Sequence, residues 1–165
     1  MADVRVVATG LRFPEGPVAM ADGSVILGEI AGGTVTRVAP DGTKSTITAA
    51  GGGPNGLARG PDGALYLCNN GGAEYATGSF LATGPAKNYQ CGYVQRIDPR
   101  TGEMRILYSQ CGGHKLSAPN DIVFDRQGGF ISPILASGGG ATATMAVSIM
   151  RCPTGRRSSS WCIRC

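Results

Sequence analysis

The stretch that decides the fold runs from Pro54 to Leu67 and reads PNGLARGPDGALYL. A similar phrase, PEGPVAMADGSVIL, occupies residues 14–27, and a third, PNDIVFDRQGGF, occupies residues 119–130. Each of the first two phrases places short apolar runs on both sides of a glycine turn, which is the pattern of an antiparallel hairpin. The third phrase stops where its second strand should run. A repeated phrase indicates a radial or solenoid array, and the interruption indicates that the array is incomplete.

Each phrase opens a longer unit, because a second echo follows it. Residues 33–40 read GTVTRVAP and residues 92–99 read GYVQRIDP. Glycine turns between alternating apolar runs predict four hairpins. The predicted strand pairs are 17–20 with 24–28, 34–38 with 45–48, 56–59 with 64–67, and 93–98 with 103–109. We also expect an opening strand over residues 3–7.

About four strands over roughly 40–45 residues are typical of one propeller blade. The sequence therefore predicts an all-β chain that holds about two and a half blades. The 27 glycines and 10 prolines among 165 residues agree with many short strands joined by turns. Residues 71–91 interrupt the second unit as an insertion, and such insertions emerge on one face and often cover a binding site. The alternative is a glycine-rich sandwich with accidental Asp-Gly turns.

The net charge of +4 arises outside the repeats. Residues 131–165 contain Arg151, Arg156, Arg157 and Arg164 and no acidic residue. The remaining eleven basic side chains equal the eleven acidic ones, so the repeat region carries no net charge. This balance argues against a nucleic-acid-binding role.

The sequence shows neither a secretory leader nor a membrane span. Its first residues lack a basic stretch followed by a long apolar run, and no stretch approaches the roughly 20 apolar residues that cross a bilayer. The cysteines before residue 131 are Cys68, Cys91 and Cys111, an odd number without framework spacing, so we expect free thiols. These features predict a cytoplasmic protein.

Radial repetition converts sequence position into geometry, because residues at the same phase of successive blades lie at the same height and radius. Glu15, Asn55 and Asn120 each follow the proline of their phrase. We therefore expect all three side chains to point into one central pocket. One carboxylate and two carboxamides form an oxygen-rich set that suits Ca²⁺ or Mg²⁺ and also admits Zn²⁺ or Mn²⁺. In the alternative interpretation, these residues only form Asx-type turns.

The same residues resemble a known family. Residues 11–17 (LRFPEGP), 54–58 (PNGLA) and 118–123 (APNDIV) are similar to the SGL family, the senescence-marker, gluconolactonase and luciferin-regenerating-enzyme group. The resemblance covers residues 4–130. It implies a six-bladed propeller with a divalent cation in its central channel, and hydrolysis of sugar lactones or related esters.

The resemblance also implies roles for individual residues. Glu15 looks like the family's first metal ligand, and Asn120 looks like the asparagine that holds water or substrate beside the metal. Asp121 is similar to an acidic position that joins the metal shell in some members. We therefore expect Glu15, Asn120 and Asp121 to bind the metal, with Ca²⁺ as the first candidate. Asn55, which has weaker family support, is expected to contact the substrate together with Asn120.

By this resemblance, the cation would act as a Lewis acid on the lactone carbonyl, and a nearby carboxylate would take a proton from water. The chain departs from the family at this point. The later-blade asparagine and aspartate that complete the metal shell, the aspartate doubling as general base, have no counterpart. We therefore expect an N-terminal fragment of a lactone hydrolase that is inactive alone. The alternatives are a non-catalytic propeller that serves as a binding module and a gene product without function.

The sequence changes character after Phe130. Acidic residues and Asp-Gly turns are absent from residues 131–165. A reading shifted by one base after Phe130 restores a Tyr-Phe-Thr-Asp continuation, a Gly-Val-Tyr-Tyr strand and a Pro-Asp-Gly turn, which again resemble the SGL family. We therefore divide the chain into residues 1–130, the N-terminal blades, and residues 131–165, an out-of-frame tail expected to be disordered. The alternative is a genuine divergent tail or a natural short isoform.

The expected partner is a small sugar lactone or related ester, with neither nucleic acid nor membrane involved. The sequence does not predict an oligomeric state. Similar strand phrases recur in strictosidine-synthase-like propellers, which remain an alternative. An array that does not close leaves strand edges and apolar faces exposed, so we expect low solubility.

Overall fold

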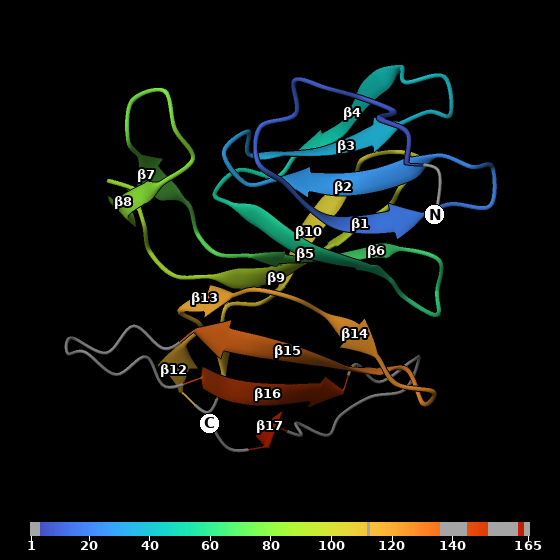
Figure 1. Ribbon diagram of the computed structural model, residues 1–165. Helices are drawn as coiled ribbons and strands as arrows, with labels where there is room; N and C mark the ends of the chain where they lie inside the picture. Colours follow the sequence, from blue (N-terminus) through green and yellow to red (C-terminus); the bar gives the residue numbers. More distant parts are fainter. Residues whose placement is uncertain (1–3, 112, 136–144, 152–161, 164–165) are drawn as a thin grey trace.

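The computed structural model describes residues 4–111, 113–135, 145–151 and 162–163, and every helix or strand assigned in them is a β-strand (Figure 1). The first sheet contains four antiparallel strands in chain order. These strands are β1 (Pro14–Ala19), β2 (Val25–Glu29), β3 (Thr34–Val38) and β4 (Lys44–Ala49). The turns predicted at the Asp-Gly pairs join β1 to β2 and β3 to β4, so the first two predicted hairpins are confirmed.

The second sheet repeats this plan with one interruption. Its strands are β5 (Pro54–Arg59), β6 (Leu65–Asn69), β9 (Tyr93–Ile97) and β10 (Met104–Tyr108). They lie in the order β10-β9-β6-β5, which confirms the other two predicted hairpins. The insertion between β6 and β9 forms a small hairpin of its own, β7 (Ala73–Tyr75) with β8 (Ala82–Pro85), which projects beyond the second sheet (Figure 1).

The third sheet lies below the second in Figure 1. It contains β13 (Ala118–Pro119), β14 (Val123–Phe124), β15 (Gly129–Leu135), β16 (Met145–Arg151) and β17 (Cys162–Ile163). A separate pair, β11 (Gln110–Cys111) with β12 (His114–Lys115), precedes it. The predicted domain boundary at residue 130 falls inside β15, and strands are assigned within residues 131–163. The out-of-frame origin of this segment stays a prediction.

Alternating side chains of the second sheet form two apolar cores. Because successive residues of a strand point to opposite faces, Leu65 and Leu67 pack toward the first sheet while Tyr66 and Cys68 pack toward the third. The first core also contains Ile26 and Val35 from the first sheet. The second core contains Leu116, Ile122 and Phe130 from the third region. The three sheets therefore stack face to face through apolar contacts.

The predicted opening strand is wrong for the residues that the structure describes. Residues 4–13 contain no strand, and the side chains of Val4 and Val6 are 88% and 75% exposed. The segment instead runs past the outer strand β4, where Lys44 Nζ donates a hydrogen bond to the Thr9 carbonyl at 2.7 Å. The apolar alternation was correct as a local pattern, but a strand needs a partner, and this segment has none among the described strands.

The cysteines differ from one another in a way that spacing did not predict. Cys68 and Cys91 are free thiols, as expected, whereas Cys111 is disulfide-bonded, contrary to our expectation. The prediction failed because the three spacings gave no framework, and pairing in a folded chain depends on distance in space.

In the described part of the chain, no helix has the length and apolar character needed to cross a bilayer.

Candidate functional site

The expected site residues each directly follow the proline of their phrase, and each lies in or next to a strand. Glu15 and Asn55 are the second residues of β1 and β5, and Asn120 directly follows β13. In Figure 1 these strands begin, or in the case of β13 lie, at the same side of the stacked sheets. We call this side the motif end. The structure therefore brings the predicted site residues to one end of the fold.

Close backbone contacts hold these three positions next to one another. The Gly56 N–H donates a hydrogen bond to the Asn120 carbonyl at 2.7 Å. A Cβ atom on Gly56 would collide with the backbone of Asn120 and Asp121. A Cβ atom on Gly16 would lie 2.7 Å from the Asn55 carbonyl oxygen and would also collide with the Leu57 N–H group. The glycines that follow Glu15 and Asn55 thus permit the adjacent strands to meet.

The side chains at this end are accessible and largely uncommitted. Glu15, Asn120 and Asp121 are exposed, and Asn55 is half-buried. In the described structure, the Glu15 carboxylate and the Asn55 and Asn120 carboxamides make no hydrogen bond or ion pair. Asp121 Oδ1 accepts a hydrogen bond from the Ile122 N–H at 2.8 Å. The alternative that Asn55 and Asn120 serve Asx-type turns therefore has no support among the described residues.

This donor set has the chemistry that a hard divalent cation prefers. Two carboxylates and two carboxamides offer only oxygen, whereas Ca²⁺ takes about six to eight oxygen ligands. Among the residues that the structure describes, no group of three His, Cys, Asp or Glu side chains could hold a metal ion. The four side chains therefore fit such a cation but supply only part of its shell, and the metal site stays a proposal.

A buried carboxylate that we did not predict positions the entrance to β1. Glu29, at the end of β2, is only 9% exposed and accepts hydrogen bonds from the Arg12 N–H at 2.6 Å and the Thr36 hydroxyl at 2.6 Å. The carbonyls of Arg12 and Phe13 accept hydrogen bonds from Ala31 and Ile30 in turn. These bonds fix the turn from which Pro14 and Glu15 emerge.

The second sheet contains an equivalent group at the same position. Asn69, at the end of β6, is fully buried, and its Oδ1 accepts hydrogen bonds from Gly53 N–H at 2.9 Å and Gly71 N–H at 3.0 Å. Its amide nitrogen donates to the Gly51 carbonyl and to Gln95 Oε1. Sequence reasoning missed both residues. The detectable signal was a polar residue ending an otherwise apolar strand, at the same offset from Asn55 as Glu29 has from Glu15.

The insertion reaches the motif end through aromatic contacts, and its covering role stays a prediction. The Phe13 ring lies 5.6 Å from the Phe80 ring and 6.4 Å from the Tyr75 ring, measured between centroids. Phe13 adopts φ 59°, a backbone conformation that side chains with a Cβ rarely adopt. Because Phe13 directly precedes Pro14, the β7–β8 hairpin lies beside the entrance to β1.

Cys68 lies beneath the motif end but is not suited to be a nucleophile. Its Sγ donates to the Asp121 carbonyl at 3.2 Å and lies 3.2 Å from Ser132 Oγ. Burial raises the pKa of the Cys68 thiol to about 12, despite the opposing effect of the Ser132 hydroxyl. The thiol is therefore protonated at neutral pH and acts as a packing group.

Comparison with solved structures supports a propeller-type fold. A gluconolactonase from Xanthomonas campestris has a TM-score of 0.63 and 19% identity, over 85% of this chain and 44% of that chain. A structural-genomics protein assigned as a gluconolactonase has a TM-score of 0.64 and 20% identity, over 89% and 48%. A virginiamycin B lyase from Staphylococcus aureus has a TM-score of 0.53 and 15% identity, over 87% and 43%. This chain thus spans less than half the length of each structure.

Sequence comparison is more specific. Among curated proteins, no sequence matches the chain significantly. The family model of the SMP-30/gluconolactonase/LRE-like region matches residues 13–151, which include all the expected site residues and extend beyond residue 130. The chain therefore belongs to the SMP-30/gluconolactonase/LRE-like family.

Proposed function

We propose that this chain is the N-terminal part of a six-bladed propeller that hydrolyses sugar lactones with the help of a divalent cation. The observation that carries the proposal is the uncommitted carboxylate of Glu15 at the motif end. Glu15 lies on β1, which packs against β5, the strand that carries Asn55. The next residue of β5, Gly56, donates a hydrogen bond to the Asn120 carbonyl. A scaffold strand has no need of a carboxylate at this phase.

The residues divide into two roles. Glu15, Asn120 and Asp121 would hold the cation, with Ca²⁺ preferred over Zn²⁺, Mg²⁺ or Mn²⁺ because all the donors are hard oxygens. When bound, the cation would supply Lewis acidity toward the ester carbonyl of the lactone. The Asn55 and Asn120 carboxamides would orient the lactone by donating and accepting hydrogen bonds. The insertion hairpin would limit access of water from one side.

The chain by itself is proposed to be inactive. Hydrolysis needs a base that takes a proton from the attacking water, and the expected aspartate belongs to blades that this sequence does not contain. The chain spans 44% and 48% of the two gluconolactonase structures, which agrees with an incomplete ring. The alternatives are a non-catalytic binding module, favoured by the lack of a three-acid cluster in the described residues, and a product without function. A cytoplasmic location stays a prediction.

A lactone assay tests this proposal. Hydrolysis of δ-gluconolactone should be followed in a pH-stat for the 165-residue chain and for a longer protein translated in the shifted frame. We expect hydrolysis only by the longer protein, with loss on chelation and recovery on Ca²⁺ addition. Glu15→Gln should lower kcat/KM by at least about a hundredfold.

The matched control is Glu103→Gln, which removes an exposed carboxylate from the turn between β9 and β10. This variant should retain full activity. Hydrolysis that survives chelation, or a Glu15→Gln variant as active as Glu103→Gln, would exclude the proposed metal chemistry.

A further inference from the structure

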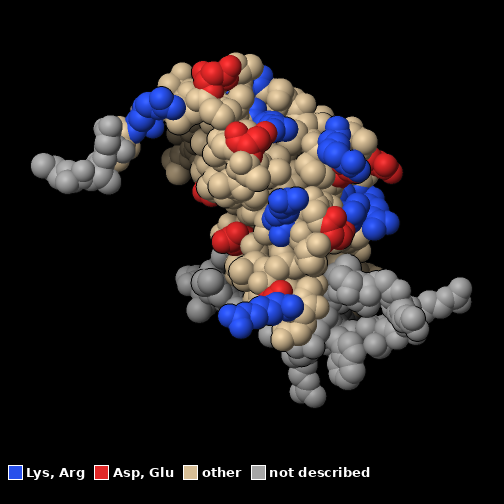
Figure 2. Space-filling model, turned by 90° about the vertical axis from the view of Figure 1, so that its right-hand side faces the viewer, with Lys and Arg blue, Asp and Glu red and all other residues tan. Residues whose placement is uncertain are grey.

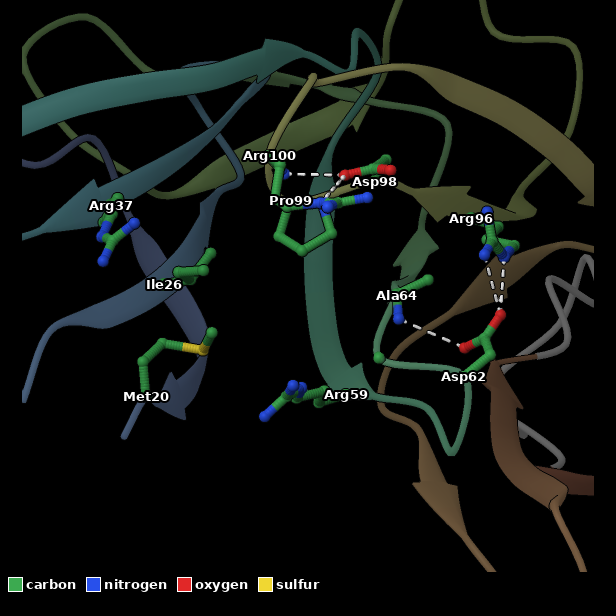
Figure 3. Close-up of a pocket in the computed structure, with 11 residues that line it drawn as sticks. Met20, Ile26, Arg37, Arg59, Asp62, Ala64, Arg96, Asp98, Pro99 and Arg100 are labelled. Atoms are coloured by element: carbon green, nitrogen blue, oxygen red, sulfur yellow. Dashed lines mark hydrogen bonds and ion pairs between the residues drawn. The ribbon is translucent and has the colours of Figure 1, made fainter. Parts of the chain in front are cut away.

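A second cavity lies at the end of the sheets opposite to the motif end. It has a volume of about 430 Å³ and lies between the first and second sheets, beside the turns that close the β1–β2, β5–β6 and β9–β10 hairpins. Met20 and Ile26 line it from the first sheet, and Arg59, Ala64 and Pro99 line it from the second (Figure 3). We call this cavity the interblade cleft. All of its described lining residues belong to the first two repeats.

The cleft carries an excess of positive charge. Its lining includes four arginines and two aspartates: Arg37, Arg59, Arg96, Arg100, Asp62 and Asp98. Figure 2 shows the face that carries these turns, where basic side chains lie among acidic ones over the described surface. An excess of arginines around a concave site attracts anions.

Three of the four arginines have acidic partners. Arg96 forms an ion pair with Asp62 at 2.8 Å, and Arg100 lies 3.7 Å from Asp98. Arg37 pairs with Asp22, which lies just outside the cleft. The Arg59 guanidinium makes no hydrogen bond or ion pair in the described part of the chain. Its guanidinium is therefore the uncompensated charge of the site.

The position of Arg59 directs this charge toward the cleft. Arg59 is the last residue of β5, and its side chain extends toward Met20, in the turn after β1 (Figure 3). Ile26 and Ala64, 1% and 3% exposed, lie buried beneath the cleft, so the accessible part of its apolar floor comes from Met20 and Pro99, which are both half-buried. A guanidinium above an apolar floor offers a planar fork of donors for an anionic group and a surface for an organic body.

We propose that the interblade cleft binds a small organic anion, with its phosphate or carboxylate group on Arg59 and its body on Met20 and Pro99. The cavity is larger than a bare oxyanion, which favours a ligand with a non-polar part. The neighbouring ion pairs hold the other arginines in place and keep Asp62 and Asp98 from neutralising Arg59. The site is separate from the motif end, because the full lengths of β1 and β5 lie between them.

Ligand-observed NMR on the purified 165-residue chain tests this proposal with phenyl phosphate, benzoate, inorganic phosphate and benzyl alcohol as probes. We expect phenyl phosphate or benzoate to bind with a Kd below about 10 mM, more tightly than inorganic phosphate or the neutral alcohol. The preferred acid identifies the head group. Arg59→Ala should weaken binding about tenfold or more.

Two further variants make the test decisive. Met20→Glu should also abolish binding, because it introduces a negative charge beside Arg59. Arg126→Ala removes an exposed arginine from the turn before β15, outside the cleft, and should bind as the wild type does. The proposal is overturned if neither acid binds by about 10 mM, if Arg59→Ala binds as tightly as Arg126→Ala, or if benzyl alcohol binds as tightly as the acids.

Discussion

The first two repeats and the third share a strand register but differ in the residue that pairs with the proline of the phrase. Pro14 pairs with Glu29, Pro54 pairs with Asn69, and Pro119 pairs with Ile134. In the first two repeats the partner of the proline is a buried polar group that binds the backbone leading into the inner strand. The third repeat has an apolar residue at this position, so its sequence cannot supply the same hydrogen bonds.

The shifted reading, which stays a prediction, would remove this difference. Its Tyr-Phe-Thr-Asp continuation after Phe130 places an aspartate at position 134, aligned with Glu29 and Asn69. On this prediction, the observed frame departs from the repeat between Phe130 and this position. The comparison shows that the backbone register of the first two repeats recurs in the third, whereas the polar partner of the proline does not.

The reactivity of the two free thiols tests the contact between the second and third repeats. The expected difference between these thiols is the largest effect predicted here. Cys68 faces Ser132 and is buried, whereas Cys91 is half-buried near the insertion. Because burial raises the pKa of Cys68 to about 12, its thiolate fraction near pH 8 is about a thousandfold below that of an ordinary cysteine. Iodoacetamide should therefore modify Cys91 and leave Cys68 unmodified. Equal modification of both thiols by mass spectrometry would show that the third repeat does not cover the second.

The buried polar groups that the first two repeats share provide the next largest effect. Asn69→Leu leaves the Gly53 and Gly71 N–H groups without a partner, so it should lower the free energy of unfolding by about 3 kcal/mol. Asn70→Ala, which removes one hydrogen bond to Gly72, should cost about 1 kcal/mol. Urea unfolding measures both. Equal losses would mean that Asn69 does not hold the strand entrance.

The glycines that let the repeats approach one another give a smaller effect. Gly56→Ala should cost about 2 kcal/mol, because its Cβ would meet the Asn120 and Asp121 backbone. Gly84→Ala is the matched control, since it has ordinary φ and open space around its Cβ, and it should change stability by less than about 0.5 kcal/mol. The same urea titration separates them. A Gly56→Ala variant as stable as Gly84→Ala would contradict the close packing of the motif end.

The hairpin turns of the first two repeats each carry an ion pair, Asp22 with Arg37 and Asp62 with Arg96. The pH dependence of stability that these pairs confer is the smallest effect predicted here. Burial raises the pKa of Asp62, but the Arg96 guanidinium and the hydrogen bonds from Ala64 and Tyr66 outweigh it and hold the pKa below its usual value. Because the pKa of the Asp62 carboxyl is lower in the folded than in the unfolded chain, its ionised form stabilises the fold above about pH 4. This contribution is lost as the pH falls through the folded-state pKa. Asp62→Asn should therefore cost less than about 1 kcal/mol at pH 7 and nothing at low pH. A constant difference across this range would contradict the ion-pair assignment.

Sequence patterns predicted the parts of the fold that depend on local chemistry. Asp-Gly turns place three of the hairpins within a few residues and the Thr101-Gly102 turn places the fourth, so the four hairpins were found. The opening strand over residues 3–7 was wrong, because pairing depends on a partner distant in the sequence. Repeat phase also predicted that Glu15, Asn55 and Asn120 lie at one end of the fold. This holds because the three sheets share a register, so residues at the same position of each repeat lie at the same height.

Other features depend on contacts that one-dimensional patterns do not record. The roles of Glu29 and Asn69 follow from which backbone N–H groups remain unpaired beside them. The uncompensated charge of Arg59 follows from the ion pairs of its neighbours, and the disulfide at Cys111 follows from proximity in space. A polar residue recurring at one offset in successive repeats is the signal that could have revealed the first of these.

The nucleotide sequence across codons 128–134 and onward to the next stop codon tests the central comparison most directly. The account predicts that the shifted frame encodes an aspartate at position 134 and continues into further propeller repeats, with a later Pro-Asn-Gly phrase and a late aspartate. It would be contradicted if the observed frame were the only open one. In that case Ile134 would be the native residue and a short binding module would replace the lactonase as the better interpretation.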